Sequence, residues 1–275
     1  MQAGTSQTAR TAAPRLEPEI LRLPTPFYLF RLITGSDHLH FGYFNTEFDG
    51  LEEAQENMMD LNLFFRPRRS YRVLDVGSGL GATARRLAKL GCSVTAICPD
   101  PALVRYARAV EAAEPAGPPI EWIVSGFESW AAGAAPYDVV MFQESFQYLD
   151  DVEGTLRRAH SLLRPGGRLL VGAQFLNEDR PRAAARFHFV DRFIAATRAS
   201  GFRMTTHCDV SGGAFLMTQR VLERLRVSKD ELIARYEPSK PTIRKDVEDM
   251  LYWGGQELGA FEHSLLSYRL FVLDR

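Results

Sequence analysis

The chain has 275 residues, 45% of them hydrophobic, so it can bury one sizeable core with room for a small added subdomain. Its 33 Lys and Arg nearly balance 34 Asp and Glu, and the formal net charge of −1 argues against nucleic-acid or anionic-membrane partners. The three cysteines form no C-x-x-C pair, which argues against a disulfide scaffold or a thiolate zinc site and favours a reducing cytoplasm.

The N-terminal part divides into two expected regions. No stretch approaches the roughly 20 apolar residues that span a bilayer, and the opening MQAGTSQTARTAAPRLEPE lacks the apolar core of a signal peptide. We therefore expect residues 1–26 to be a disordered tail of a cytoplasmic protein. Residues 27–66 are rich in aromatic side chains and are expected to form a helical cap, interrupted at FGYF (residues 41–44).

Strands and helices are predicted to alternate over residues 67–211. Short β-branched and apolar runs predict the strands, and apolar residues at helical spacing predict the helices between them. One helix start is marked by Asp100 as N-cap and Pro101 at the first helical position. The expected strands are 71–76, 93–98, 120–124, 137–143, 168–175 and 202–210, and the expected helices are 82–90, 101–114, 152–163 and 187–200.

Residues 212–262 are expected to be a helical insertion of two or three amphipathic helices. A last strand at 265–273, within residues 263–275, is expected to return to the core. Near-continuous apolar strands separated by helices are typical of a parallel sheet covered on both faces. The sequence therefore predicts an α/β fold with a helical addition.

The stretch VLDVGSGLGAT (residues 73–83) joins an expected strand to an expected helix. Its three glycines would let a ligand approach the backbone and the helix N-terminus. The stretch also satisfies the loose dinucleotide pattern G-x-G-x-x-G/A, which alone is weak evidence. Asp75, however, would repel a pyrophosphate and suit an ammonium group, and Cys98 stands where an acid should hold a ribose. A compact cationic ligand with an adenosine tail fits better.

This stretch resembles motif I of the class I methyltransferases that use S-adenosyl-L-methionine (SAM). VTAICPDPALVRYAR, YDVVMFQESFQYLDD and LLRPGGRLLVGAQF follow in that family's order, and the resemblance covers residues 41–175 well. GFRMTTHCDVS, the insertion and LLSYRLFVLDR look most like the small-molecule branch with tocopherol, sterol and sarcosine methyltransferases. The resemblance implies a Rossmann-like, seven-stranded, mostly parallel sheet with a reversed C-terminal hairpin, and a helical lid from residues 27–65 and 212–262.

The resemblance also implies cofactor-binding residues. Asp75, Gly77 and Gly79 would line the methionyl part of SAM, and Tyr43 in FGYF would close over it. The other candidates for cofactor binding follow the glycines or lie at the ends of neighbouring strands. They are Ser78, Cys98, Pro99, Phe127 and Gln143.

The sequence departs from the family at two polar positions. Cys98 replaces the acid that usually accepts the ribose hydroxyls, and Gly126 replaces the Asp usually placed beside the adenine amine. Glu128 or Asp100 could substitute from neighbouring positions. A carboxylate–diol contact is worth roughly 1.5–3 kcal/mol, so altered cofactor binding is expected.

FQESFQYLDD is the candidate catalytic segment. Glu144 and Ser145 match the E-S-x-x-H of the tocopherol-like branch, and Tyr148 replaces its histidine. Methyl transfer needs alignment and a dry pocket more than acid–base power. Glu144 could deprotonate an acceptor or stabilise a cation, or it could cap a helix or form a salt bridge. Tyr148 could orient the acceptor or serve as half-buried packing.

We expect a SAM-dependent methyltransferase that methylates carbon or oxygen of a small, largely apolar, natural-product or quinone-like acceptor. The alternative is a methyltransferase-fold protein that binds SAM or its product without methyl transfer, as a cyclase, a rearrangement catalyst or a non-catalytic partner. His38 and His40 form H-x-H, but without a third ligand a polar loop pair is favoured, and no metal is expected. Self-association as a homodimer is left open.

Overall fold

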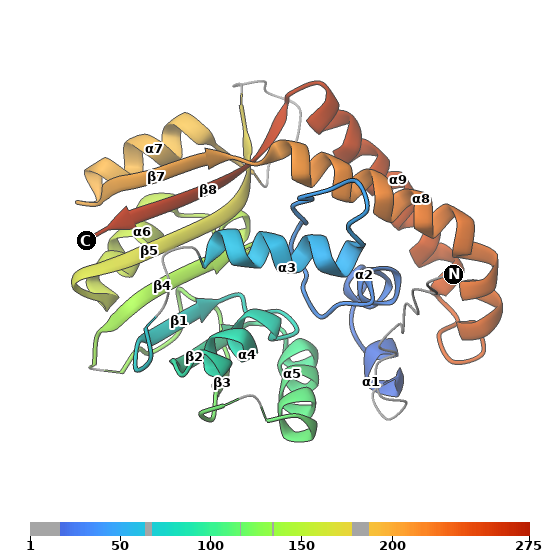
Figure 1. Ribbon diagram of the computed structural model, residues 1–275, viewed down its shortest axis with the longest axis horizontal. Coiled ribbons are helices and arrows are strands. Elements are labelled where there is room, and N and C mark those ends of the chain that lie inside the picture. Colours follow the sequence, from blue (N-terminus) through green and yellow to red (C-terminus); the bar gives the residue numbers. More distant parts are fainter. Residues whose placement is uncertain (1–16, 64–67, 116, 134, 178–186) are drawn as a thin grey trace, which may run out of the picture.

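A central sheet organises the chain, and helices cover both of its faces (Figure 1). The computed structural model describes residues 17–63, 68–115, 117–133, 135–177 and 187–275. The strand order is β3-β2-β1-β4-β5-β8-β7, and β6 pairs with the end of β5. The strands are β1 (Arg72–Val76), β2 (Ser93–Cys98), β3 (Glu121–Val124), β4 (Tyr137–Gln143), β5 (Leu163–Leu176), β6 (His188–Phe189), β7 (Arg203–Asp209) and β8 (Leu266–Asp274).

The strands from β3 to β5 pair in parallel, whereas β8 runs antiparallel to both of its neighbours, β5 and β7. The expected α/β, Rossmann-like fold with a mostly parallel sheet and a reversed C-terminal hairpin is therefore confirmed. The sheet has eight strands, and not seven, because His188 and Phe189 pair with the end of β5 where the sequence predicted the start of a helix.

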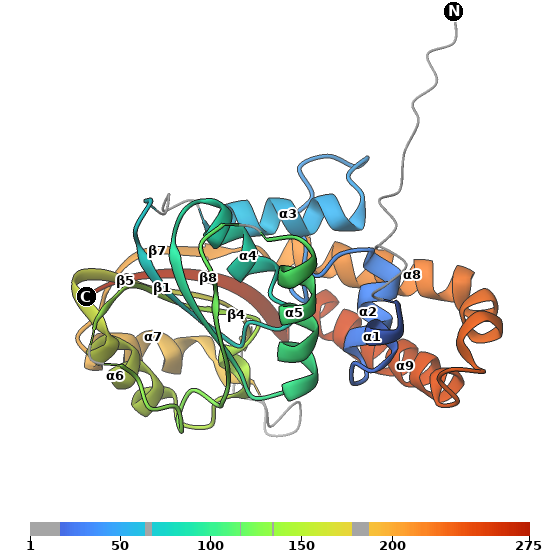
Figure 2. The ribbon, with the colours of Figure 1, turned by 90° about the horizontal axis from the view of Figure 1, so that it is seen from below.

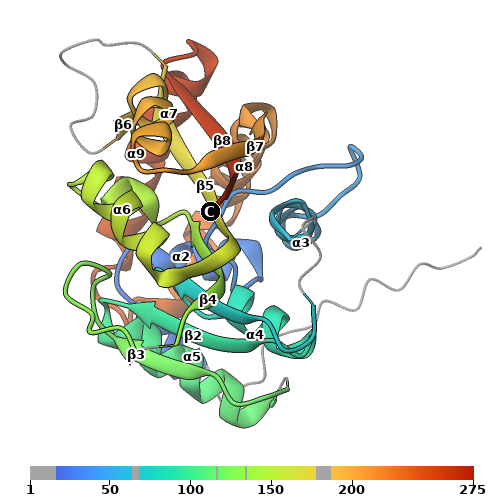
Figure 3. The same ribbon diagram turned by 90° about the vertical axis from the view of Figure 1, so that its left-hand side faces the viewer.

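Two helical layers sandwich the sheet (Figure 3). Successive residues of a strand point to opposite faces, so Val73 packs with α4 and α5 while Leu74 packs with α6 and α7. The helices are α1 (Glu17–Leu21), α2 (Phe27–Thr34), α3 (Leu51–Asn62), α4 (Ala82–Lys89), α5 (Pro101–Ala113), α6 (Val152–Leu162), α7 (Val190–Ala199), α8 (Ser211–Tyr236) and α9 (Ile243–Glu262), with a 3₁₀ turn η1 (Phe146–Tyr148) after β4.

The start of α5 follows from its capping residues. The Asp100 side chain accepts hydrogen bonds from the backbone N–H groups of Ala102 and Leu103, at 2.7 and 3.3 Å, and Pro101 opens the helix. These contacts satisfy donors that the first helical turn leaves free. The N-cap expected from the sequence is present.

The helices α1, α2, α8 and α9 gather at the end of the molecule away from the C-terminus (Figure 2). The Tyr28 hydroxyl on α2 donates a hydrogen bond to Asp246 on α9 at 2.7 Å. The insertion consists of two long helices, since α8 begins at Ser211 and α9 ends at Glu262. In the described ranges, no helix combines the length and the apolar character that crossing a membrane requires.

The expected disordered tail is wrong for residues 17–26. Residues 17–21 form α1, Ile20 and Leu23 are buried, and Glu17 accepts a hydrogen bond from Arg235 on α8 at 2.7 Å. Charged residues surround these two apolar side chains in the sequence, so the helical spacing of Ile20 and Leu23 was not recognised. Residues 1–16 of the expected tail, and residues 64–67 at the end of the expected cap, lie outside the described residues.

The strand β5 is longer than the sequence predicted. It begins at Leu163, which pairs with Tyr137 of β4, and it includes the R-P-G-G segment that was expected to end the preceding helix. The Arg275 N–H donates to the Gly167 carbonyl group at 3.0 Å. Contact with Arg275 therefore holds this segment against the sheet, although Gly166 within it has a φ of +74°.

Candidate cofactor and active site

The glycine loop turns sharply between β1 and α4. Gly77 has a φ of +75°, which favours glycine, and a Cβ there would lie 2.3 Å from the Cβ atom of Ser145. The Ser145 hydroxyl donates to the carbonyl group of Val76 at 2.5 Å. The close packing of this glycine fixes the end of β4 against the loop that follows β1.

A cavity of about 30 Å³, the room of a single water molecule, lies at this loop. Its walls come from residues 37–40, from the segment 77–80 with Ala82 and Thr83, and from Asp75 and Gln143. The structure thus brings five predicted cofactor residues to one place: Asp75, Gly77, Ser78, Gly79 and Gln143.

Asp75 is a buried carboxyl group that lacks a counter-charge. It is 2% exposed, its Oδ2 atom makes no hydrogen bond among the described residues, and burial raises its pKa to about 7. The Ser78 hydroxyl and the Gln143 amide nitrogen are also buried without a partner in the described chain. Buried polar groups are normally hydrogen-bonded, so these three side chains could bind a polar ligand in the cavity. The residues therefore fit the ammonium and neighbouring polar groups of SAM.

The other four predicted cofactor residues are described residues that do not line this cavity. Cys98 is buried at the end of β2, where burial raises the pKa of its thiol and the backbone N–H of Gly79 faces the sulfur. Phe127 is buried, with its ring edge-on to Phe142, whereas Pro99 is exposed. Tyr43 is partly buried and lies apart, in a cluster of apolar residues from α3, α8 and β8.

The two suggested substitutes for the ribose acid differ in their surroundings. Asp100 caps α5 through its Oδ1 atom, and Glu128 is exposed beside Gly126. Whether either of them replaces the acid at Cys98 stays a prediction.

Glu144 lies just after β4 with a φ of +56°, a backbone conformation that is rare for a residue with a side chain. Its N–H donates to the Gly172 carbonyl group at 2.8 Å. The Oε1 atom is buried without a hydrogen-bond partner in the described chain, and Gln147 donates to Oε2 at 3.0 Å. A strained strand end that carries an enclosed acid is a common feature of active sites.

Burial raises the pKa of Glu144 to about 8, and the nearby charge of Glu257 adds to this rise. The hydrogen bond from Gln147 acts in the opposite direction, as do the Tyr268 hydroxyl and the Phe41 backbone N–H, which face the carboxyl group. Four parts of the chain thus converge on one carboxyl group. Tyr148 does not join them, because it is 63% exposed at the end of η1.

Sequence reasoning missed Gln147, Tyr268 and Glu257. Tyr268 is fully buried in β8, and Glu257 on α9 accepts a hydrogen bond from Gln174 of β5 at 2.6 Å. The one available signal was a tyrosine within the apolar strand LLSYRLFVL. A buried phenol needs a polar group nearby. Here that group is Glu144, which acts on the Tyr268 hydroxyl and lies more than 100 residues earlier in the chain.

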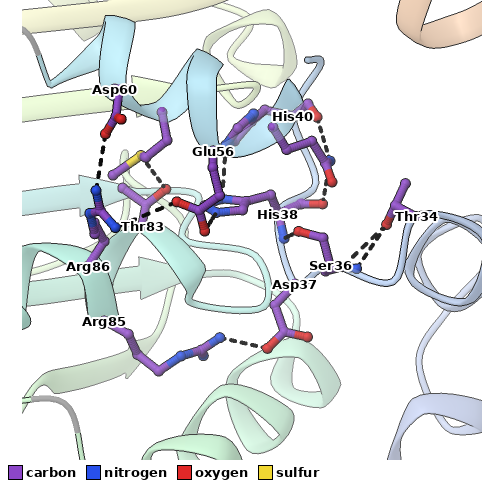
Figure 4. A network of polar contacts seen from close by, with 12 residues as sticks. Thr34, Ser36, Asp37, His38, His40, Glu56, Asp60, Thr83, Arg85 and Arg86 are labelled. Carbon is purple, nitrogen blue, oxygen red and sulfur yellow. Dashed lines mark hydrogen bonds and ion pairs between the residues drawn. The ribbon is translucent and has the colours of Figure 1, made fainter. Parts of the chain in front are cut away.

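His38 and His40 form a hydrogen-bonded pair on the cavity wall (Figure 4). Nδ1 of His38 lies 2.9 Å from Nε2 of His40, and the second nitrogens face Glu56 at 3.1 Å and the Phe41 carbonyl group at 2.8 Å. Burial lowers the pKa of His40 well below its ordinary value. No group of three or more potential metal ligands occurs in the described part of the chain.

A glycine loop after β1, a buried acid beside that loop and an enclosed carboxyl group after β4 lie at the carboxyl ends of a Rossmann-like sheet, where open α/β sheets bind their ligands. A methyltransferase-domain family model matches residues 51–214. The chain belongs to this family, in agreement with the class I, SAM-dependent resemblance read from the sequence. At the level of the family, the expected enzyme class and the SAM cofactor are confirmed.

Two curated relatives and one solved structure illustrate the likeness. The ubiquinone biosynthesis O-methyltransferase of Methylocella silvestris is 39% identical over 112 residues, 41% of this chain and 42% of that protein. The sarcosine/dimethylglycine N-methyltransferase of Halorhodospira halochloris is 31% identical over 157 residues, 55% of this chain and 56% of that protein. The chain thus matches about half or less of the length of these relatives.

The solved structure of the cyclopropane synthase MmaA2 from Mycobacterium tuberculosis has a TM-score of 0.80 and 20% identity, and the match covers 95% of this chain and 99% of that chain. At this identity the likeness bears on the fold. It extends over the cap and the insertion as well as the sheet.

Proposed function

We propose that the chain transfers the methyl group of SAM to a hydroxyl oxygen or an acidic carbon of a small, largely apolar acceptor of natural-product or quinone-like type. The enclosed carboxyl group of Glu144, next to the glycine-loop cavity, is the observation that carries this proposal. The name of the Methylocella silvestris relative, a ubiquinone biosynthesis O-methyltransferase, supports a quinone-like acceptor.

The surroundings of Glu144 support an apolar acceptor. The ring of Phe41 packs edge-on against Phe261 and Tyr268, with ring centres 5.7 and 5.3 Å apart. Tyr43, Phe187 and Phe189 belong to or pack against the same cluster. Aromatic side chains recognise flat apolar molecules through their faces and edges.

SAM supplies an electrophilic methyl group on a positively charged sulfur. The residues of this chain would bind it and manage the acceptor's proton. Asp75 would pair with the ammonium group, and Gly77 and Gly79 would allow the ligand to approach the backbone. Glu144 would accept the acceptor's proton at Oε1, and Gln147 and Tyr268 would hold its carboxyl group in place. Tyr148 remains a candidate for contact with a bound acceptor at the surface.

Replacing Glu144 with Gln tests the catalytic assignment. A general base contributes about 10²–10⁴-fold, so we expect turnover at saturating SAM to fall by that factor. Turnover is measured as S-adenosylhomocysteine released with a hydroxylated quinone acceptor, and affinity by calorimetry. Glu153→Gln is the control, because its side chain is 64% exposed on α6. An undiminished rate in Glu144→Gln would remove this residue from the mechanism.

The alternative is a protein that binds SAM or its product without methyl transfer. The observation in its favour is that Cys98, a buried thiol, stands at the position where the family usually has the ribose-binding acid, while Asp100 caps a helix. Product without stoichiometric S-adenosylhomocysteine would support this alternative and contradict our proposal. A cytoplasmic location and a homodimer remain predictions.

A further inference from the structure

Among the described residues, the charged group that acts on the Glu144 carboxyl group is Glu257 of α9, which has the same sign. Tyr268 of β8 is neutral, Gln147 donates a hydrogen bond without charge, and the uncharged Phe41 N–H faces the carboxyl group. Among the described residues, no Lys, Arg or His forms an ion pair with Glu144. An enclosed acid beside another acid and without a cation favours its protonated form.

Glu144 also adjoins the candidate cofactor site. Gln143, the preceding residue, lines the cavity with Asp75, and its Oε1 atom accepts a hydrogen bond from Thr83 at 2.9 Å. Ser145, the following residue, packs directly on Gly77. The backbone of Glu144 therefore lies between two residues that touch the loop, and Phe41, whose N–H faces the carboxyl group, follows His40 of the cavity wall. A positive charge on a ligand in this site would act on the carboxyl group.

We propose that Glu144 releases its proton when the positively charged cofactor binds and keeps it when the uncharged-sulfur product binds, with Tyr268 and Gln147 as positioning residues. This inference rests on the proposed function, because it requires the methyl donor to occupy the glycine-loop site. An opposite charge within about 4–6 Å lowers a carboxyl pKa by about 1–3. Near pH 7.5 such a change converts Glu144 from mostly protonated to mostly ionised.

The coupling makes Glu144 a base only in the SAM-bound state. It fits an acceptor whose reacting oxygen carries an ionisable proton, as a phenol does. The acceptor oxygen takes the methyl group, its proton passes to Oε1 of Glu144, and the electron pair of the broken sulfur–carbon bond remains on sulfur. One positive and one negative charge disappear together. The summed charge of the cofactor sulfur and the Glu144 carboxyl group is therefore zero both before and after the transfer.

Calorimetry in buffers of different ionisation enthalpy measures the proton release. SAM and S-adenosylhomocysteine share the ammonium group, so any proton that Asp75 loses is released with both ligands. We expect SAM to release about half a proton or more in excess of S-adenosylhomocysteine at pH 7.5, and Glu144→Gln to abolish the excess. Equal proton numbers for both ligands in the unaltered protein would overturn the inference and leave the proposed function standing. Failure of both ligands to bind would overturn the proposed function itself.

Two further variants test the positioning of the carboxyl group without removing it. Glu257→Gln removes a like charge, so the midpoint of the pH range over which the excess is released should fall. Tyr268→Phe removes a nearby hydroxyl group that favours the ionised form, so that midpoint should rise. If these two side chains served only to pack against their neighbours, neither substitution would change its midpoint. If both midpoints stay unchanged, or if an excess persists in Glu144→Gln, the assignment to this carboxyl group is wrong.

Discussion

Ionisation of the buried Asp75 side chain destabilises the unliganded protein. Its carboxyl group is 2% exposed and has no counter-charge among the described residues, so ionisation is unfavourable in the folded state. The same burial leaves the Asp75 carboxyl group available to bind a cation. Residues of this kind trade folding stability for affinity.

We therefore predict that Asp75→Asn stabilises the cofactor-free protein at pH 8. The folded-state pKa, about 7, is raised above the ordinary value of 3.8, so the folded protein holds an extra proton between these pH values and the free energy of unfolding falls as the pH rises through them. The full difference amounts to at most roughly 4 kcal/mol. The midpoint of thermal unfolding should be measured from pH 4 to pH 8 for both proteins. Parallel curves would contradict the assignment, and loss of SAM binding in the variant should accompany the stabilisation.

The loop between α2 and α3 is the element that closes the cavity. It is held by Asp37, which accepts from Arg31 of α2 at 2.6 Å, from Arg85 of α4 at 2.6 Å and from Tyr106 of α5 at 2.8 Å. Figure 4 shows the pair with Arg85. One carboxylate thus connects three helices to the loop that also carries His38 and His40.

Asp37→Asn should strongly destabilise the fold. The Arg31 and Arg85 side chains are only 11% and 13% exposed, so the change leaves two enclosed cations without their counter-charge. Breaking such a pair costs about 3–5 kcal/mol, and partial exposure places the expected loss near the lower limit. Urea unfolding measures it. The exposed pair Arg157–Glu153 provides the control, since Arg157→Gln should cost less than about 1 kcal/mol. Equal losses in the two variants would show that this ion cluster does not anchor the loop.

At the scale of the whole molecule, cap, insertion and sheet share one core. The largest apolar cluster contains Ile33 of α2, Leu225 of α8 and Val247 of α9 together with Val73 of β1 and Ala96 of β2. The polar contact between Tyr28 and Asp246 lies within the same region. The lid is therefore continuous with the core, and not a separately folded domain.

This continuity predicts a single unfolding transition. Trp122 and Trp130 are buried beside the sheet, and Trp253 is 66% exposed on α9. Urea curves from far-ultraviolet circular dichroism should coincide with those from the fluorescence of a variant that retains only Trp253 and of one that lacks it. An earlier transition reported by Trp253 alone would show that the insertion unfolds independently.

The sequence predicts the strands β1 to β4 and the start of α5 because their signals are local: apolar runs, an N-cap and a proline. The helix α1 and the strand β6 escape prediction because each depends on distant partners, namely Arg235 for Glu17 and the end of β5 for His188. The grouping of Asp75 with the glycine loop follows from one motif. The surroundings of Glu144 do not, because Tyr268 and Glu257 reach it only through strand register and the path of the insertion.

The placement of β8 has a consequence for synthesis of the protein. This strand lies between β5 and β7, although it follows both in the sequence and is separated from β7 by the two long helices. A nascent chain that has emerged only through α9 would expose two unpaired strand edges, which are sites for aggregation. Tyr268 arrives with the same strand. The joining of β5 to β7 and the placement of Tyr268 beside Glu144 are thus one event, which follows the synthesis of α9.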